Sequence, residues 1–125
     1  MPARGKVSGV VMSGQPTRLN VGMITRVYDG DTVTCDLDIG FGIALKATKL
    51  RLKGIDTPEL RGTSGDVKKR AYAARDYLRS LILGKEVLIR THGKGKYGRW
   101  LATIYHERTD VNEHLIRKGH AQKYM

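Results

Sequence analysis

The sequence predicts an α+β fold: a five-stranded Greek-key β-barrel of the OB type with two or three flanking helices. Three observations lead to this prediction: five segments with strand-like patterning, a helical segment between the third and fourth of them, and an excess of basic residues. The chain has 125 residues, which is enough for one hydrophobic core and too few for two. We therefore expect one folded domain over residues 19–125, preceded by a flexible arm over residues 1–18.

The first two predicted strands form a hairpin. Apolar and polar residues alternate over 21–28 and 32–39, and the apolar residues of the second segment share one face: Val33, Cys35, Leu37 and Ile39. The Asp29-Gly30 dipeptide between the segments favours a tight turn, because glycine accepts a positive φ. We expect the carboxylates of Asp29 and Asp31 to project from the tip of this hairpin.

A third strand is predicted over residues 43–55, with an irregularity inside it. Its apolar residues change phase, from the odd positions Ile43, Leu45 and Ala47 to the even positions Leu50 and Leu52. A β-bulge or kink near Thr48 would explain this change. Beyond it, Arg51 should point outward between two core leucines, and Gly54 and Pro58 should end the strand and turn the chain.

The remaining predicted elements are a long helix, two strands and a short helix. The long helix covers residues 66–83, ends at Gly84, and has apolar residues at helical spacing: Val67, Ala71, Ala74, Leu78, Leu81 and Ile82. Its other face carries basic residues: Lys68, Lys69, Arg70 and Arg79. Strands follow at 86–91 and 100–105, joined by a glycine-rich basic loop. Asp110 can cap a final helix, with Glu113 three residues later, and Gly119 ends it.

The composition indicates a polyanionic partner. The chain has 23 Lys and Arg against 12 Asp and Glu, which gives a formal net charge of +11 and favours nucleic acid first and an anionic membrane surface second. No apolar run approaches the roughly 18 residues that a membrane-crossing helix needs. The single cysteine, Cys35, excludes an internal disulfide, and the four histidines lack the spacing of a zinc site. No export signal is visible, so we expect a bacterial, plasmid or phage protein that is cytoplasmic, with secretion left open because a signal could have been removed.

Three short segments combine residues that suit phosphodiester chemistry. They are DGDT with Asp29 and Asp31, RLKGIDTPEL with Arg51, Asp56, Thr57 and Glu59, and GKGKYGRW with Lys94, Lys96, Tyr97 and Arg99. Each segment alone has an ordinary structural interpretation: a turn, a surface ion-pair cluster and a flexible basic hairpin. Together they supply carboxylates for a hard cation, two arginines for a phosphodiester and a further carboxylate for a water molecule. Phosphodiester hydrolysis needs that combination.

The same segments resemble a known family. DGDTV, RLKGIDTPE, KGKYGRWLATIY and VNEHLIRKGHA occur in this order and are similar to the staphylococcal (micrococcal) nuclease or thermonuclease family, over about residues 21–124. The resemblance implies an OB-fold barrel and a nuclease that binds one Ca²⁺ and cleaves DNA and RNA, single- or double-stranded, to 3′-phosphate products. We therefore expect DNA and RNA as partners, no membrane association and a monomer.

The resemblance also implies which residues bind the metal. Asp31 and Asp56 match the family's metal-binding carboxylates. Thr57 matches the residue that offers a backbone carbonyl to the same ion, and Asp29 matches a nearby acidic residue that supports the metal indirectly. Two carboxylates, a carbonyl and water form the kind of flexible oxygen site that suits Ca²⁺.

Further residues match the family's substrate and catalytic positions. Glu59 matches the carboxylate proposed as the general base for the attacking water. Arg51 and Arg99 match the two arginines that hold the scissile phosphate, a role that suits their planar guanidinium groups. Lys96 and Tyr97 resemble the positions that contact a nucleotide's terminal phosphate.

Three other classes of function remain open at this stage. A non-catalytic OB or nuclease-like module would bind nucleic acid through the same basic face, but such modules usually lose part of the acidic and arginine set, and here none is missing. A basic membrane-surface protein and a structural subunit of a phage or ribonucleoprotein assembly are the other two. The chain also departs from the family's best-known member after Glu59, where ELRGTSGDVKKRA replaces a longer lysine-rich loop. Substrate preference is therefore open.

Overall fold

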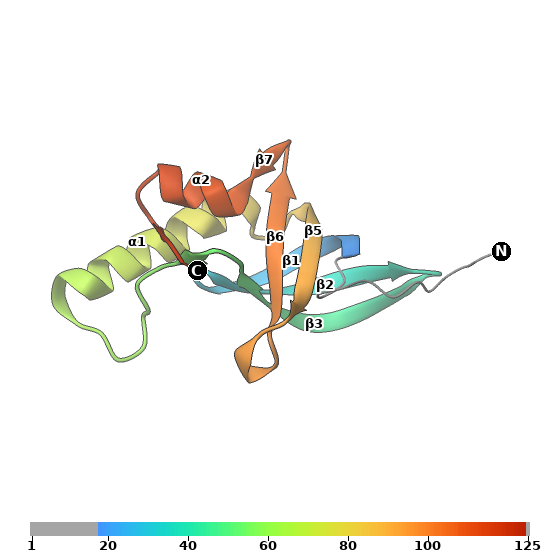
Figure 1. Cartoon of the computed structure of the whole chain (residues 1–125), viewed down its shortest axis with the longest axis horizontal. Helices are drawn as coiled ribbons and strands as arrows, with labels where there is room; N and C mark the ends of the chain where they lie inside the picture. Colours follow the sequence, from blue (N-terminus) through green and yellow to red (C-terminus); the bar gives the residue numbers. More distant parts are fainter. Residues whose placement is uncertain (1–17, 125) are drawn as a thin grey trace.

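The structure of the protein is a computed structural model that describes residues 18–124 (Figure 1). Its strands are β1 (Arg18–Asp29), β2 (Thr32–Gly40), β3 (Ile43–Leu52), β4 (Ile55–Asp56), β5 (Glu86–Lys94), β6 (Trp100–His106), β7 (Thr109–Asp110) and β8 (Gln122–Lys123). Its helices are α1 (Gly65–Ile82), α2 (Val111–Arg117) and the short 3₁₀ helix η2 (Lys96–Gly98). Residues 1–17, which hold nearly all of the predicted arm, lie outside the described residues, and Arg18 is the first residue of β1.

The predicted five-stranded barrel is confirmed. Strands lie in the order β3-β2-β1-β5-β6-β7, and a further pairing of β3 with β6 closes the barrel. That closing pair is parallel and places Arg51 beside Leu101. The two-residue strands β4 and β8 pair separately, so the predicted strand over 43–55 is in fact interrupted by a turn at Lys53 and Gly54. This turn lets the chain leave the barrel just after Arg51.

The core fills the barrel and the space beneath α1. Its fully buried members come from every long strand and from both α-helices, and the largest include Ile24, Leu50, Leu52, Leu78, Ile89, Ile104 and Leu115. Burying one such side chain contributes about 1.5–3 kcal/mol, so these residues dominate the stability of the fold. Helix α1 buries Ala71, Ala74, Leu78 and Ile82, whereas Val67, predicted on the same face, is exposed. Neither α1 nor α2, the α-helices found within residues 18–124, has the length and apolar character that crossing a membrane requires.

The predicted irregularity near Thr48 is a β-bulge. Thr48 pairs with Cys35 and Leu45 pairs with Leu37, so two residues of β3 oppose Asp36 alone. Ala47 in the bulge has a φ of 53°, and its N–H donates to the Asp36 carboxylate at 3.0 Å. This hydrogen bond is the main reason that the pKa of Asp36 lies below its ordinary value. The bulge changes the phase of β3 and thereby turns Leu50 and Leu52 into the core.

The distal part of the β2–β3 hairpin extends away from the barrel (Figure 1). For this reason the prediction that Ile39 lies on the core face is wrong: Ile39 is 39% exposed, whereas Val33 and Cys35 are fully buried. The alternating pattern leads to burial as far as Leu37, which is 6% exposed, and no longer does so at Ile39, near the end of β2.

The final helix begins and ends as the sequence predicts. The Asp110 side chain accepts a hydrogen bond from the Glu113 N–H at 3.0 Å, which satisfies one free donor of the first turn. The Glu113 carboxylate instead pairs with Arg117 at 3.3 Å, so the reciprocal half of a capping box is not formed. Gly119, with a φ of 81°, follows the end of α2.

Candidate active site

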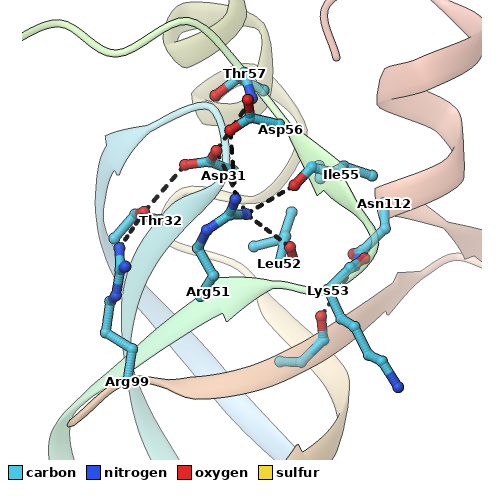
Figure 2. A network of polar contacts seen from close by, with 11 residues as sticks. Asp31, Thr32, Arg51, Leu52, Lys53, Ile55, Asp56, Thr57, Arg99 and Asn112 are labelled. Carbon is cyan, nitrogen blue, oxygen red and sulfur yellow. Dashed lines mark hydrogen bonds and ion pairs between the residues drawn. The ribbon is translucent and has the colours of Figure 1, made fainter. Parts of the chain in front are cut away.

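The predicted site residues gather where three segments of the barrel meet: the β1–β2 turn, the end of β3 with β4, and the start of β6. The register explains the meeting, because Thr32 of β2 is the cross-strand partner of Arg51 and the parallel pairing places Arg51 beside Leu101, two residues after Arg99. Side chains alternate along each strand, so the residues that flank buried Val33 and Leu50 share the outer face of the barrel. Figure 2 shows the resulting cluster.

The β1–β2 turn differs from the prediction in two respects. Asp29 and Asp31 are 7% and 5% exposed, so their carboxylates are buried and do not project from the tip. Gly30 does not have a positive φ. A Cβ there would lie 2.8 Å from the Ala74 Cβ and 3.0 Å from the Thr57 Cγ2. Glycine is thus required by the close approach of α1 and Thr57, which presses the turn against the barrel and covers both carboxylates.

Asp31 is held in place by groups from three segments. One carboxylate oxygen accepts from the Thr57 N–H at 3.1 Å, and the other accepts from the Thr32 hydroxyl at 3.1 Å. The Arg51 guanidinium lies 3.4 Å from the first of these oxygens. These contacts leave the carboxylate little freedom to rotate, which is the condition for a well-defined binding site.

Arg51 is the central side chain of the cluster. Its Nη1 donates to the backbone carbonyls of Leu52 and Ile55, both at 2.9 Å, and its Nη2 donates to the Asp56 carboxylate at 3.4 Å. The guanidinium therefore touches both predicted metal-binding carboxylates. A guanidinium has five N–H donors, and three are used by these hydrogen bonds. Donors on Nε and Nη2 remain for a ligand.

Arg99 joins the same cluster through Thr32 (Figure 2). The Arg99 Nη1 donates to the Thr32 hydroxyl oxygen at 3.3 Å, and that hydroxyl donates to Asp31. The Arg99 Nε is buried and has no hydrogen-bond partner among residues 18–124. A buried donor without an acceptor is costly, and an anion bound beside Arg99 would supply the acceptor.

The remaining predicted residues surround this cluster at different depths. Asp56 has a side chain that is 55% exposed, and Thr57 is 4% exposed. Glu59 is exposed, and its side chain makes no hydrogen bond or ion pair within the described residues.

The pKa of Asp29 is raised above its ordinary value, mainly by burial. The neighbouring charges of Asp31 and Glu59 raise it further, whereas the N–H of Leu60 and the charge of Arg75 lower it.

Lys96 and Tyr97 lie on η2, away from the carboxylates. Tyr97 is 87% exposed, has a φ of 63°, and its ring centroid lies 5.6 Å from the Arg99 guanidinium carbon. Lys96 is also exposed. Both side chains are therefore accessible to a ligand that reaches outward from Arg99, and η2 is the segment that would contact its far end.

The oxygen atoms in the cluster fit one hard cation. No group of three or more His, Cys, Asp or Glu side chains gathers as a metal site within residues 18–124, so a cation here would have to rely on Asp31, Asp56, backbone carbonyls and water. The Thr57 hydroxyl, which lies beside Gly30, is buried without a hydrogen-bond partner in the same part of the chain. An all-oxygen donor set with an unsatisfied hydroxyl nearby suits Ca²⁺ and its bound water.

Two residues of the region were missed by sequence reasoning. Thr32 connects Asp31 to Arg99, and its place directly after Asp31 on the outward phase of β2 could have revealed it. Asn112 is 4% exposed and supports the turn after Arg51: its Nδ2 donates to the carbonyls of Lys53 and Ala102 at 2.9 Å each, and its Oδ1 accepts from the Ile104 N–H at 3.2 Å. A polar residue at the start of a short helix gave no signal of this role.

Comparisons with known proteins agree with the motifs. Residues 49–125 match the family described as "Staphylococcal nuclease homologue". The chain is 32% identical over 114 residues to an uncharacterized endonuclease of Haemophilus influenzae, which covers 91% of this chain and 58% of that protein. It is 34% identical over 106 residues to an uncharacterized endonuclease of Escherichia coli O157:H7, covering 82% and 60%.

A thermonuclease of Staphylococcus hyicus is also similar, with 31% identity over 101 residues that cover 79% of this chain and 56% of that protein. The chain thus spans less than two thirds of the length of each of these relatives. The family match at residues 49–125 includes Arg51, Asp56, Glu59 and Arg99 and begins after Asp31.

Proposed function

This chain belongs to the staphylococcal nuclease family, and from that premise we propose that it is a calcium-dependent, largely sequence-nonspecific nuclease that hydrolyses DNA and RNA to 3′-phosphate products. The observation that carries the proposal is the convergence of Asp31, Asp56 and Arg51, with Arg99 joined to them through Thr32. Two carboxylates and two guanidinium groups on one rigid barrel edge suit a phosphodiester better than any other common ligand.

Asp31, Asp56 and the Thr57 carbonyl would hold one Ca²⁺. When bound, the ion would supply Lewis-acid stabilisation of charge on the phosphate. The rigid position of Asp31 favours one binding geometry, whereas the exposed Asp56 leaves the substrate side open. Asp29, buried behind the turn, would support this set without touching the ion.

The two arginines would bind the scissile phosphate from opposite sides. Arg51 keeps free donors on Nε and Nη2 after its three hydrogen bonds, and Arg99 has its Nε without an acceptor within the described residues. Both can make bidentate contacts to phosphate oxygens whose negative charge grows in the transition state. Because the donors are fixed in advance, little reorganisation is needed when the reaction occurs.

Glu59 would orient or deprotonate the attacking water. Its carboxylate is exposed and free of hydrogen bonds to other side chains, and it acts electrostatically on buried Asp29. The Glu59 carboxylate has both oxygens free for a water molecule, whereas the Asp31 oxygens are occupied by Thr57, Thr32 and Arg51. Lys96 and Tyr97 would contact a terminal phosphate beyond Arg99.

The proposal is tested by cleavage of a labelled oligonucleotide in Ca²⁺, in Mg²⁺ and with a chelator. We expect turnover in Ca²⁺, poor turnover in Mg²⁺, which demands stricter octahedral geometry, and none with chelator. Substrate affinity should fall steeply with added salt, because the contacts are to backbone phosphates. A wild-type chain that does not cleave in saturating Ca²⁺ refutes the proposed activity and leaves a non-catalytic binding module.

Variants then assign the roles. Glu59→Gln should lower kcat by about 10²–10⁴-fold with little change in binding. Arg51→Lys and Arg99→Lys should each cost about 10²-fold or more, because an ammonium cannot reproduce the bidentate contact. The matched controls are Glu86→Gln and Arg108→Lys, at exposed positions outside the cluster, and they should cleave at the wild-type rate. Equal rates for site and control variants would disprove the assignment.

A further inference from the structure

A second basic site lies between β1, the segment at Leu60 and Arg61, and α1. It is a cleft of about 250 Å³, and five of its nine lining residues are cationic: Arg26, Arg61, Lys68, Arg75 and Arg79. No carboxylate lines the cleft. The catalytic role proposed above uses none of these five side chains, two of which, Lys68 and Arg79, belong to the predicted basic face of the helix.

Two tyrosines hold part of this charge in place. The Arg75 guanidinium carbon lies 4.7 Å from the Tyr72 ring centroid, and the Arg26 guanidinium carbon lies 5.6 Å from the Tyr28 ring centroid. Both tyrosines line the cleft and both are 43% exposed. A guanidinium held against an aromatic ring keeps its edge free for an anion, and an exposed ring offers a surface on which a base can stack.

The positive charge of the cleft is only partly neutralised. Asp76, outside the lining, lies 3.0 Å from Arg75 and 3.9 Å from Arg79, and buried Asp29 interacts electrostatically with Arg75. Five cationic groups against these two carboxylates leave 5 − 2 = +3. The Arg79 Nε is buried and has no hydrogen-bond acceptor within residues 18–124. An unsatisfied donor in a basic cleft favours an anionic ligand.

Two segments of chain lead from the candidate active site to the cleft. Tyr28 directly precedes Asp29, and Leu60 and Arg61 directly follow Glu59. The Leu60 N–H donates to the Asp29 carboxylate at 3.4 Å, which joins these two segments. A nucleic-acid strand that leaves the cluster past Glu59 would therefore enter the cleft.

We propose that this cleft binds a second phosphodiester of the substrate strand, next to the scissile one, with Tyr28 and Tyr72 stacking against its bases. The inference rests on the proposed function, because it takes the substrate to be a nucleic-acid strand running past Glu59. The cleft would lengthen the bound segment and favour long single-stranded substrates over dinucleotides.

The test measures binding without cleavage. Fluorescence anisotropy in chelator gives the affinity for a labelled dinucleotide and for a longer oligothymidylate. The variant is Arg61→Gln with Lys68→Gln, because neither side chain makes a hydrogen bond or ion pair within the described part of the chain, so folding should be unaffected. Arg108→Gln is the control, since Arg108 lines a different pocket that shares no residue with the cleft.

We expect the double variant to bind the longer oligonucleotide about tenfold more weakly, from two partly exposed charge contacts. The slope of log affinity against log salt concentration should fall by about 0.7, since the cleft contacts one phosphodiester and each phosphate contact on a single strand contributes about 0.7. Dinucleotide affinity should not change, and the control should match the wild type. The single charge reversal Lys68→Glu should likewise weaken binding of the longer oligonucleotide and leave binding of the dinucleotide unchanged.

Several results would overturn the inference. Unchanged affinity for the longer oligonucleotide, or an equal loss on both substrates, excludes the cleft as a separate subsite. A second such result is that the wild type and the double variant bind the oligonucleotide equally well, while the wild type binds inorganic phosphate or anionic phospholipid vesicles more tightly. That result would identify a free-anion or lipid site instead. A protein that shows the expected binding but never cleaves in Ca²⁺ refutes only the proposed activity, so the two failures are distinguishable.

Discussion

Replacing Gly30 with alanine tests how the fold shapes the candidate site. The added Cβ would lie 2.8 Å from the Ala74 Cβ, closer than such atoms approach, and 3.0 Å from the Thr57 Cγ2, which is a tight contact. The φ of Gly30 is not positive, so the cost comes from the contact and not from backbone strain. The turn must move away from α1 and Thr57, and the hydrogen bond between the Thr57 N–H and Asp31 should lengthen.

The expected loss of stability follows from these contacts. Overpacking of this size costs about 1–3 kcal/mol. Ala74→Gly alone should cost about 1 kcal/mol in helix propensity and about 0.8 kcal/mol for the buried methyl group. In the double variant the Ala74 contact is relieved while the Thr57 contact remains. The double variant should therefore be more stable than the sum of the single losses predicts, by about 0.5–2 kcal/mol.

Urea unfolding of the wild type, both single variants and the double variant measures this coupling energy. Gly62→Ala is the control: Gly62 has a φ of 76° and no atom within 4 Å of an added Cβ, so its cost is backbone strain alone. Ala74→Gly should not rescue it. If the losses for Gly30→Ala and Ala74→Gly simply add, the close approach of α1 does not explain the glycine.

Three further outcomes are expected. Asn112→Ala should lower the free energy of unfolding by about 1–3 kcal/mol, because it removes three hydrogen bonds to backbone groups, two of them buried, and urea titration measures the loss. The pKa of His92 lies below its ordinary value, mainly through burial and then through the charges of Lys53 and Arg90. The unfolded protein therefore binds a proton at His92 more readily than the folded protein does. The free energy of unfolding of the wild type thus falls as the pH drops from the unfolded-state pKa of His92 to its lower folded-state pKa. His92→Gln should therefore lose less stability than the wild type between neutral pH and pH ~5. Cys35 is fully buried, and burial raises the pKa of its thiol to about 12, so a thiol reagent should modify it only at the rate at which the protein opens. Rapid modification of the folded protein would contradict this.

Much of the architecture could be predicted because it depends on local patterns. The helix over 66–83 differs from α1 by one residue at each end, and the cap at Asp110 is present. The phase change in the third strand indicated the bulge at Ala47 before any partner strand was known. Ile39 could not be predicted, because its exposure depends on whether another element covers it, and alternation along one strand carries no such information.

For the candidate site, the sequence by itself determined which chemical groups are present and in which order: carboxylates at Asp31 and Asp56, guanidinium groups at Arg51 and Arg99. Only the tertiary structure decided that Asp31 and Thr57, 26 residues apart, share a hydrogen bond, and that Thr32 joins Arg99 to the same cluster across 67 residues. The tertiary structure also decided that Asp29 and Asp31 are buried, and that position 30 must be glycine because Ala74 and Thr57 lie so close to it. Such contacts depend on strand register, barrel closure and helix packing. These are set by the free energy of the whole folded chain, so they cannot be predicted from any short segment.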